Sequence, residues 1–198
     1  MTTLGPTPSQ TVGPFFHDAL LRDETNVLAG PGAAGERIRV EGYVYDGDGA
    51  PVPDAIVELW QADAHGRYHH PADQRDLPLD PAFTGFGRCA TDQDGHYWFE
   101  TVKPGAVPFD AATPQAPHIA VTIFARGLLD HLSTRLYFAG EPANDADPIL
   151  RRVPEDRRAT LLAQPAAAGR GAVYRFDIVL QGEGEQAADE TVFFTFTR

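Results

Sequence analysis

Seven short segments of this chain have the side-chain alternation of β-strands, and their number and spacing limit the fold more than any other feature. In RIRVEGYVY, residues 37–45, apolar residues and one glycine alternate with charged residues and tyrosine, a period of two that indicates a half-buried strand. The other six are DAIVELW (54–60), HYWFETV (96–102), HIAVTIF (118–124), TRLYF (134–138), AVYRFDIVL (172–180) and TVFFTF (191–196). Glycine, proline and aspartate separate them, as in turns between strands. We therefore expect a mostly β fold, a two-sheet β-sandwich.

Residues 1–36 differ in composition from the rest of the chain. They are rich in proline and glycine and show no sustained period of 2 or 3.6, which predicts an extended N-terminal arm. The strand pattern begins after this arm and continues to the end, so we expect one sandwich domain over residues 37–198. A chain of 198 residues is long enough for one domain with a substantial core.

Helical pattern is scarce and is concentrated in one place. We expect one short helix near 154–164, because Pro154 suits the first helical position and two acidic residues follow it in the positive first turn. Residues 61–88 and 103–117 are rich in proline, glycine and histidine and are expected to form long loops. Long loops on a rigid sheet often carry a binding site or an interface.

The charge of the chain excludes some classes of partner. The formal net charge is −12, which disfavours binding to nucleic acid or to an anionic membrane. No stretch approaches the roughly 18–20 apolar residues that span a bilayer, and the N-terminus lacks the pattern of a signal peptide. Cys89 is the single cysteine, so an internal disulfide is excluded. We expect a cytoplasmic protein whose partners are small molecules or other proteins.

One histidine stands where a loop enters a predicted strand. In QAPHIAVTIFARG, residues 115–127, His118 is followed two places later by Ala120, and strand geometry puts both side chains on one face. Two histidines in this arrangement would indicate a metal site, but alanine supplies no donor. The residues alone leave two interpretations open, a hydrogen-bonded structural histidine or half of a metal site. No G-x-S-x-G elbow or phosphate-binding glycine loop occurs.

Three stretches together resemble a known family. They are TPSQTVGPFF (7–16), the segment 40–105 with WQADAHGRYHHPADQ near its centre, and ARGLLDHLSTRLYF (125–138). Over residues 6–197 the chain resembles the intradiol ring-cleaving dioxygenases, and in particular the alpha chain of the members that have two kinds of chain. For the assembled enzyme the resemblance implies O₂-dependent cleavage of protocatechuate to 3-carboxy-cis,cis-muconate, a step in the catabolism of aromatic compounds.

The resemblance also implies where the metal is. In the family's catalytic beta chain, two tyrosines and two histidines hold a non-haem ferric ion, because phenolate oxygens suit a hard trivalent cation. Tyr68 and His118 fall on the first tyrosine and the first histidine, but Val107 and Ala120 fall on the other two positions. Gln115 lies near the place of an arginine in the iron-binding chain. The resemblance therefore implies no metal and no catalytic residue in this chain, with Fe(III) bound by a partner beta chain.

The family's alpha chain closes the substrate pocket of the beta chain, and the resemblance implies that the arm, residues 1–36, contacts that partner. On this pattern the substrate-binding residues are Thr11, Gly13, Pro14 and Arg135. Glycine lets the backbone approach a planar ligand, threonine offers a hydroxyl, and arginine donates a fork of hydrogen bonds to a carboxylate. Without the resemblance, T-x-G-P is an ordinary turn and an arginine in a strand is a surface residue.

Three hypotheses follow from these observations. The favoured one is a non-catalytic alpha subunit, which gains iron and activity only with a beta chain. The second is an independent iron enzyme with an unusual site, in which the single chain binds ferric iron and is coloured. The third is a stand-alone β-sandwich binding module with a degenerate metal site, which stays separate from a beta chain.

Overall fold

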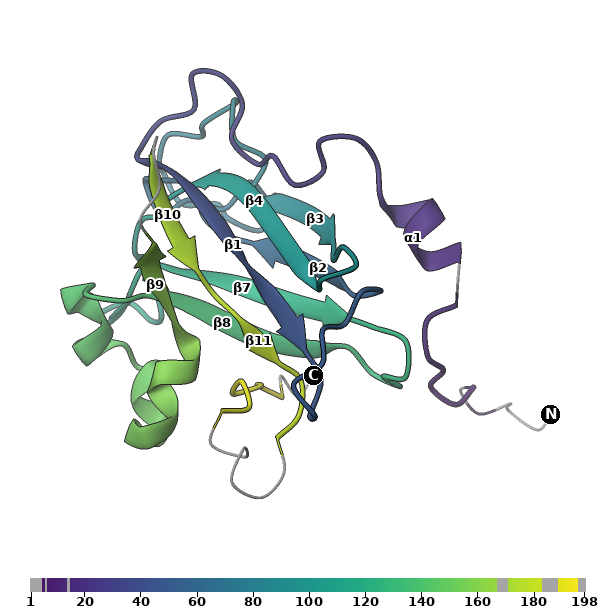
Figure 1. The fold of residues 1–198 in the computed structure, drawn as a ribbon. Coiled ribbons are helices and arrows are strands. Elements are labelled where there is room, and N and C mark those ends of the chain that lie inside the picture. The colour runs from purple at the N-terminus through teal and green to yellow at the C-terminus, as the bar shows by residue number, and fades with distance from the viewer. Residues whose placement is uncertain (1–4, 6, 14, 167–170, 183–188, 196–198) are drawn as a thin grey trace.

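The computed structural model describes residues 5, 7–13, 15–166, 171–182 and 189–195. Its strands form two layers packed face to face (Figure 1), so the predicted mostly β sandwich is confirmed. The strands are β1 (Arg37–Tyr45), β2 (Ile56–Trp60), β3 (Phe86–Ala90), β4 (His96–Val102), β5 (Val107–Pro108), β6 (Pro114–Gln115), β7 (His118–Phe124), β8 (Leu132–Phe138), β9 (Leu162–Ala166), β10 (Ala172–Arg175) and β11 (Ile178–Val179). The helices are α1 (Phe15–Leu20) and the 3-10 helices η1 (Pro142–Ala146), η2 (Leu150–Arg152) and η3 (Glu155–Leu161). No helix in the described ranges is long and apolar enough to cross a membrane.

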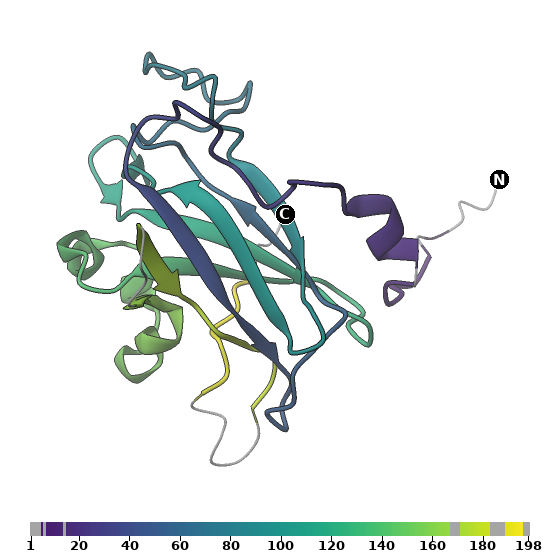
Figure 2. The same cartoon turned by 45° about the horizontal axis from the view of Figure 1, so that its top comes forward.

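The two layers are joined through β9. Strands β4, β1, β10 and β9 form the first layer, and β9 also pairs with β8, which leads through β7 and β2 to β3 in the second layer. β9 is antiparallel to β10 and parallel to β8. Figures 1 and 2 show the first layer lying across β7 and β8. A single hydrogen-bonded sheet thus folds over on itself and encloses the core.

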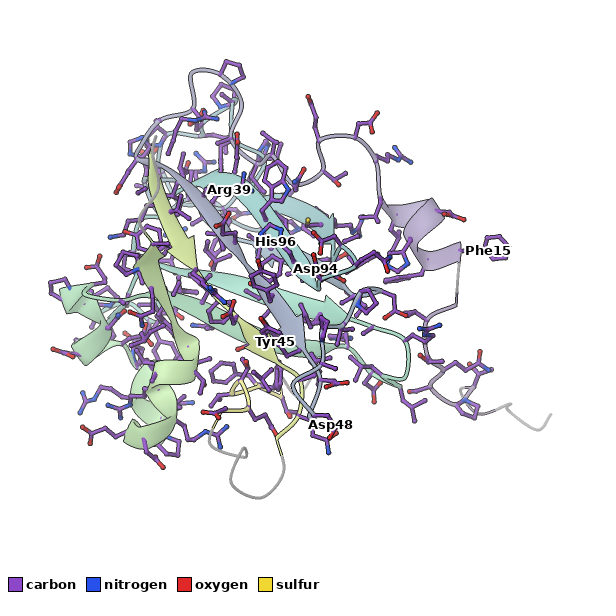
Figure 3. The ribbon with its side chains drawn as sticks, in the orientation of Figure 1. Phe15, Arg39, Tyr45, Asp48, Asp94 and His96 are labelled. Atoms are coloured by element: carbon purple, nitrogen blue, oxygen red, sulfur yellow. The ribbon has the colours of Figure 1, made fainter. Side chains whose placement is uncertain are left out.

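Side-chain alternation fills the space between the layers. Val40 and Val44 of β1 are fully buried and belong to the same apolar cluster as Ile119 of β7. Polar and aromatic side chains cover the opposite face of β1, where Figure 3 shows Arg39 and Tyr45 turned away from the core. Burial of apolar surface between the layers is the main stabilising contribution to such a fold.

The predicted strand at 172–180 is wrong in its middle, where β10 and β11 are separate strands. The backbone N–H of Tyr43 on β1 donates to the Asp177 carboxylate at 3.1 Å. The carbonyl oxygen of Phe176 accepts a hydrogen bond from the buried hydroxyl of Tyr97 at 2.5 Å. Side-chain groups therefore pair with the Tyr43 N–H and the Phe176 carbonyl, although the Phe176 N–H still donates to the Glu41 carbonyl at 2.9 Å, and the strand is interrupted there.

The predicted strand at 191–196 is also wrong over its described residues, 191–195, which form no strand. The backbone N–H of Thr191 donates to the Val179 carbonyl, whereas that of Phe194 donates to the Ser133 carbonyl. Because these bonds go to two different segments, no continuous ladder forms.

The short helix near 154–164 is confirmed as the 3-10 helix η3, but it ends earlier than expected. Pro154 precedes the helix with φ −49° and ψ 139°, so it is not the first helical residue. The chain after Leu161 pairs with β10 and β8 as β9, and this pairing ends the helix. The expected loops 61–88 and 103–117 also hold short strands, the start of β3 in the first and β5 with β6 in the second.

The N-terminal arm is extended and is interrupted by α1, which stands beside the sandwich in Figure 1. No residue of α1 is buried, and Phe15 is 78% exposed and points away from the sandwich (Figure 3). Further along, Leu28 and Ala29 are fully buried in the core. The backbone N–H of Leu28 donates to the Glu100 carbonyl at 2.8 Å. The arm is therefore anchored at Leu28 and Ala29, while Phe15–Leu20 lies on the surface.

Candidate functional site

The outer face of the second layer carries the candidate site. Trp60 of β2, Ala120 of β7 and Arg135 of β8 lie in one row across the three paired strands. His118 and Tyr137 form the next cross-strand pair on the same face. Because side chains alternate along a strand, these residues point away from the core between the two layers, and Tyr137 is buried in a second apolar cluster on the outer side.

A cavity of about 680 Å³ adjoins this face. Its lining includes Trp60, Tyr68, His70, Arg75, Val107 and Gln115. The Tyr68 ring stacks on the Trp60 indole with centroids 5.7 Å apart and an interplanar angle of 12°, and the His70 ring meets that indole edge-on. Aromatic walls with a few polar groups are typical of a pocket for a small aromatic molecule.

Tyr68 is held by the loop that follows it. Its backbone N–H donates to Asp73 Oδ2 at 2.9 Å, and the Asp73 carboxylate is paired with the Arg75 guanidinium at 2.5 Å. Burial raises the pKa of the Tyr68 phenol, although the positive charges of Arg135 and Arg75 act against this. Burial therefore keeps Tyr68 a neutral phenol at neutral pH in this chain.

His118 is buried, with 6% of its surface exposed. Its Nδ1 lies 2.7 Å from the Ala116 carbonyl oxygen, and because a carbonyl only accepts, Nδ1 carries the proton and Nε2 is the free acceptor. Burial, followed by the positive charge of Arg135, lowers the pKa of His118 to about 4. The histidine is therefore neutral at physiological pH.

This shift predicts a pH-dependent loss of stability. From pH 6.5 down to about 4, the unfolded chain takes up a proton at this residue and the folded chain does not, so the free energy of unfolding falls as the pH falls. The expected loss over this window is about 3 kcal/mol from this group. His118→Asn keeps an N–H donor for the Ala116 carbonyl but does not titrate, so urea unfolding at pH 7 and pH 4.5 should show a flatter dependence in the variant. If the free energy of unfolding falls by the same amount between pH 7 and pH 4.5 in both proteins, the lowered pKa of His118 is refuted.

The four expected ligand positions come together on this side of the molecule, but they do not form a donor set for a ferric cage. Val107 is buried in the cavity wall beside Tyr68, and Ala120 is the neighbour of Trp60 across the strands. Neither side chain has an atom that binds a metal. Among the described residues, no three His, Cys, Asp or Glu side chains gather as a metal site. One phenol and one imidazole are too few to hold a trivalent ion in a four-ligand cage.

Arg135 is a half-buried positive charge on this face. Its Nη1 donates to Gln115 Oε1 at 2.7 Å and lies 3.5 Å from the Tyr137 hydroxyl. No carboxylate of the described residues lies within 4.0 Å of the guanidinium. The remaining N–H groups of Arg135 are therefore available to an anionic ligand, and a carboxylate matches their fork.

The arm residues lie at the far end of β7. The Thr11 hydroxyl oxygen accepts a hydrogen bond from the backbone N–H of Gly127 at 2.7 Å, in the turn between β7 and β8. Gly13 is exposed, with open space where a Cβ would stand, and Pro14 lies outside the described residues. The turn is roughly 15–20 Å from Ala120 along the strand. Within this chain, Thr11 and Arg135 are not brought together.

Two features of the site escaped the sequence-based prediction. Trp60 is part of WQADAHGRY, but its stacking on Tyr68 depends on how the intervening loop folds back. Asp147 is fully buried and accepts a hydrogen bond from the Tyr137 hydroxyl at 3.1 Å. The one local signal for Asp147 was its place before Pro148, where a short polar side chain commonly caps a turn.

Comparison with known proteins defines the class of the chain. Residues 11–182 match the family model described as "Dioxygenase". The fold resembles the dioxygenase domain of a dioxygenase carbohydrate-binding protein fusion from Streptomyces sp. SirexAA-E, with a TM-score of 0.60, 29% identity, and coverage of 90% of this chain and 100% of that one. The chain belongs to the intradiol ring-cleaving dioxygenase family, whose members are oxidoreductases.

Within the family, the protocatechuate 3,4-dioxygenase alpha chain of Burkholderia cepacia is 47% identical over a 207-residue alignment that covers 98% of this chain and 99% of that one. The beta chain of the same enzyme is 41% identical over 182 residues, which cover 88% of this chain and 75% of that one. The expected similarity to an alpha chain is confirmed. The relatives thus include both the alpha chain and the beta chain of one enzyme, protocatechuate 3,4-dioxygenase.

Proposed function

We propose that this chain is the alpha subunit of protocatechuate 3,4-dioxygenase and works only with a beta subunit that holds the Fe(III). The observation that carries the proposal is the state of the site: the pocket and two of the four ligand positions are kept, while Val107 and Ala120 have no donor atoms. Similarity to an alpha chain over almost the whole length supports the same conclusion.

The chain's own contribution is to complete the substrate pocket of the beta subunit. Arg135 would donate to the carboxylate of protocatechuate, since its guanidinium has free N–H groups and no carboxylate partner among the described residues. Thr11, Gly13 and Pro14 would line the pocket from the arm, residues 1–36. The exposure of Thr11 and Gly13, far from the chain's own cavity, supports a role on another chain. Their presence would exclude water and fix the orientation of the ring.

The assembled enzyme would use protocatechuate and O₂ to form 3-carboxy-cis,cis-muconate in the cytoplasm. The net charge of −12 supports partners that are small molecules or other proteins, and it disfavours nucleic acid and membranes. The single cysteine is compatible with a reducing compartment.

Co-production with a beta chain tests this function. The chain alone, the beta chain alone and the two together are purified, and oxygen uptake with protocatechuate is measured with the size of the assembly. We expect full activity only in a complex that contains both chains. A separate monomer that ignores the beta chain would favour a binding module, and ring cleavage by the single chain would favour an independent enzyme. Either result would reject the proposal.

A further inference from the structure

We propose that Asp147 is a positioning residue that holds Arg135 ready for the carboxylate of the aromatic acid. The inference rests on the proposed function, because it assumes that Arg135 contacts this substrate. It concerns a fully buried carboxylate that is not among the residues lining the cavity.

The Asp147 carboxylate is a hub for four donors. Its Oδ1 accepts the Tyr137 hydroxyl at 3.1 Å and the backbone N–H groups of Ile149 and Leu150 at 2.9 and 2.7 Å. Its Oδ2 accepts the backbone N–H of Ala116 at 2.8 Å. Both carboxylate oxygens thus accept hydrogen bonds. These bonds connect the turn that starts η2 to β8 and to the segment before β7.

Two routes lead from this hub to Arg135. In the first, Asp147 fixes the Tyr137 hydroxyl, which lies 3.5 Å from Arg135 Nη1. In the second, Asp147 fixes the backbone of Ala116, and the adjoining Gln115 accepts from the same Nη1 at 2.7 Å. The guanidinium is therefore held at one nitrogen from two sides. Because these two contacts fix Nη1, the Arg135 side chain does not turn to another rotamer, and its other N–H groups stay directed to a ligand.

Asp147→Asn is the sharpest test of this arrangement. An amide that keeps its oxygen toward Tyr137 turns an NH₂ group toward the N–H of Ala116, where two donors repel each other. The bond that holds the Ala116 backbone next to Gln115 is then lost, while Gln115 keeps its bond to the Pro108 carbonyl and the size of the side chain at 147 is unchanged. In the complex with the beta chain, we expect KM for protocatechuate to rise about tenfold with little change in kcat. KM for catechol, which has no carboxylate, should not change.

Three companion variants separate positioning from general damage. Tyr137→Phe cuts the first route only and should raise KM for protocatechuate about threefold, which gives a second test if Asp147→Asn does not fold. In an Arg135→Ala background, Asp147→Asn should have no further effect, since nothing remains to be positioned. Asp92→Asn is the control for the same substitution at an exposed turn, because Asp92 also accepts two backbone N–H groups but lies between β3 and β4.

The outcomes distinguish this inference from the proposed function. If Arg135→Ala leaves KM for protocatechuate unchanged, the proposed contact between Arg135 and the substrate is wrong, and the positioning role of Asp147 is then wrong as well. If Arg135→Ala raises KM but neither Asp147→Asn nor Tyr137→Phe does, only the positioning role is overturned. Equal losses with catechol and protocatechuate would show that Asp147 serves stability alone and would also overturn it.

Discussion

A chain that carries Val107→Tyr, Ala120→His and Arg135→Gln is expected to bind about one ferric ion and to acquire the visible colour of iron-bound phenolate. The two added donors complete a set of two phenols and two imidazoles around the existing Tyr68 and His118. The third change removes a positive charge that lies directly opposite Ala120 on β8 and that would repel a trivalent cation. We expect the iron affinity to rise by several orders of magnitude over the parent chain.

Iron analysis and the visible spectrum of the purified variant measure this gain. The matched control is Val107→Phe, Ala120→Gln, Arg135→Gln, which adds similar bulk to the cavity without the phenol and the imidazole. If the control binds iron as well as the donor variant does, the donors are not what the parent chain lacks. Failure of the donor variant to bind iron while it remains folded would show that the pocket no longer has the geometry of a metal site.

Arg135→Ala has the second large effect that we expect. In the complex with a beta chain, it should lower kcat/KM for protocatechuate by about 10- to 100-fold, because a lost hydrogen bond to a charged group costs about 1.5–3 kcal/mol. The loss should lie in KM, since the contact is made to a carboxylate that does not react. Steady-state oxygen uptake over a range of substrate concentrations measures both constants.

Arg135→Lys and catechol are the controls for this result. Lysine keeps the charge but not the planar fork that Gln115 and a carboxylate both use, so part of the loss should remain. Turnover of catechol should be little affected by either variant. A fall in catechol turnover as large as that for protocatechuate would mean that Arg135 supports the fold or the interface and does not recognise the carboxylate.

Local pattern was enough for much of the fold. β1 has the bounds that alternation predicts, 37–45, and β7 places His118 and Ala120 on the face opposite the buried Ile119. The interruption after Arg175 could not be predicted, because it depends on a bond between Asp177 and a strand distant in the sequence. Long-range pairing has no local signature, which is why β9 was assigned to the end of a helix.

The site was predictable only in part for the same reason. Tyr68, Val107, His118 and Ala120 were placed by resemblance, and the structure brings their positions to one side of the second layer. The stacking of Tyr68 on Trp60 and the link from Tyr137 to Asp147 arise from loops that fold back over the sheet. Sequence spacing does not define such contacts.

Counting iron in the purified proteins tests the central claim most directly. We predict about one ferric ion for each pair of alpha and beta chains, and no stoichiometric iron on this chain alone, because it offers a single neutral phenol and a single imidazole. Two ferric ions per pair, or one on the isolated chain together with unaided cleavage of protocatechuate, would contradict the account.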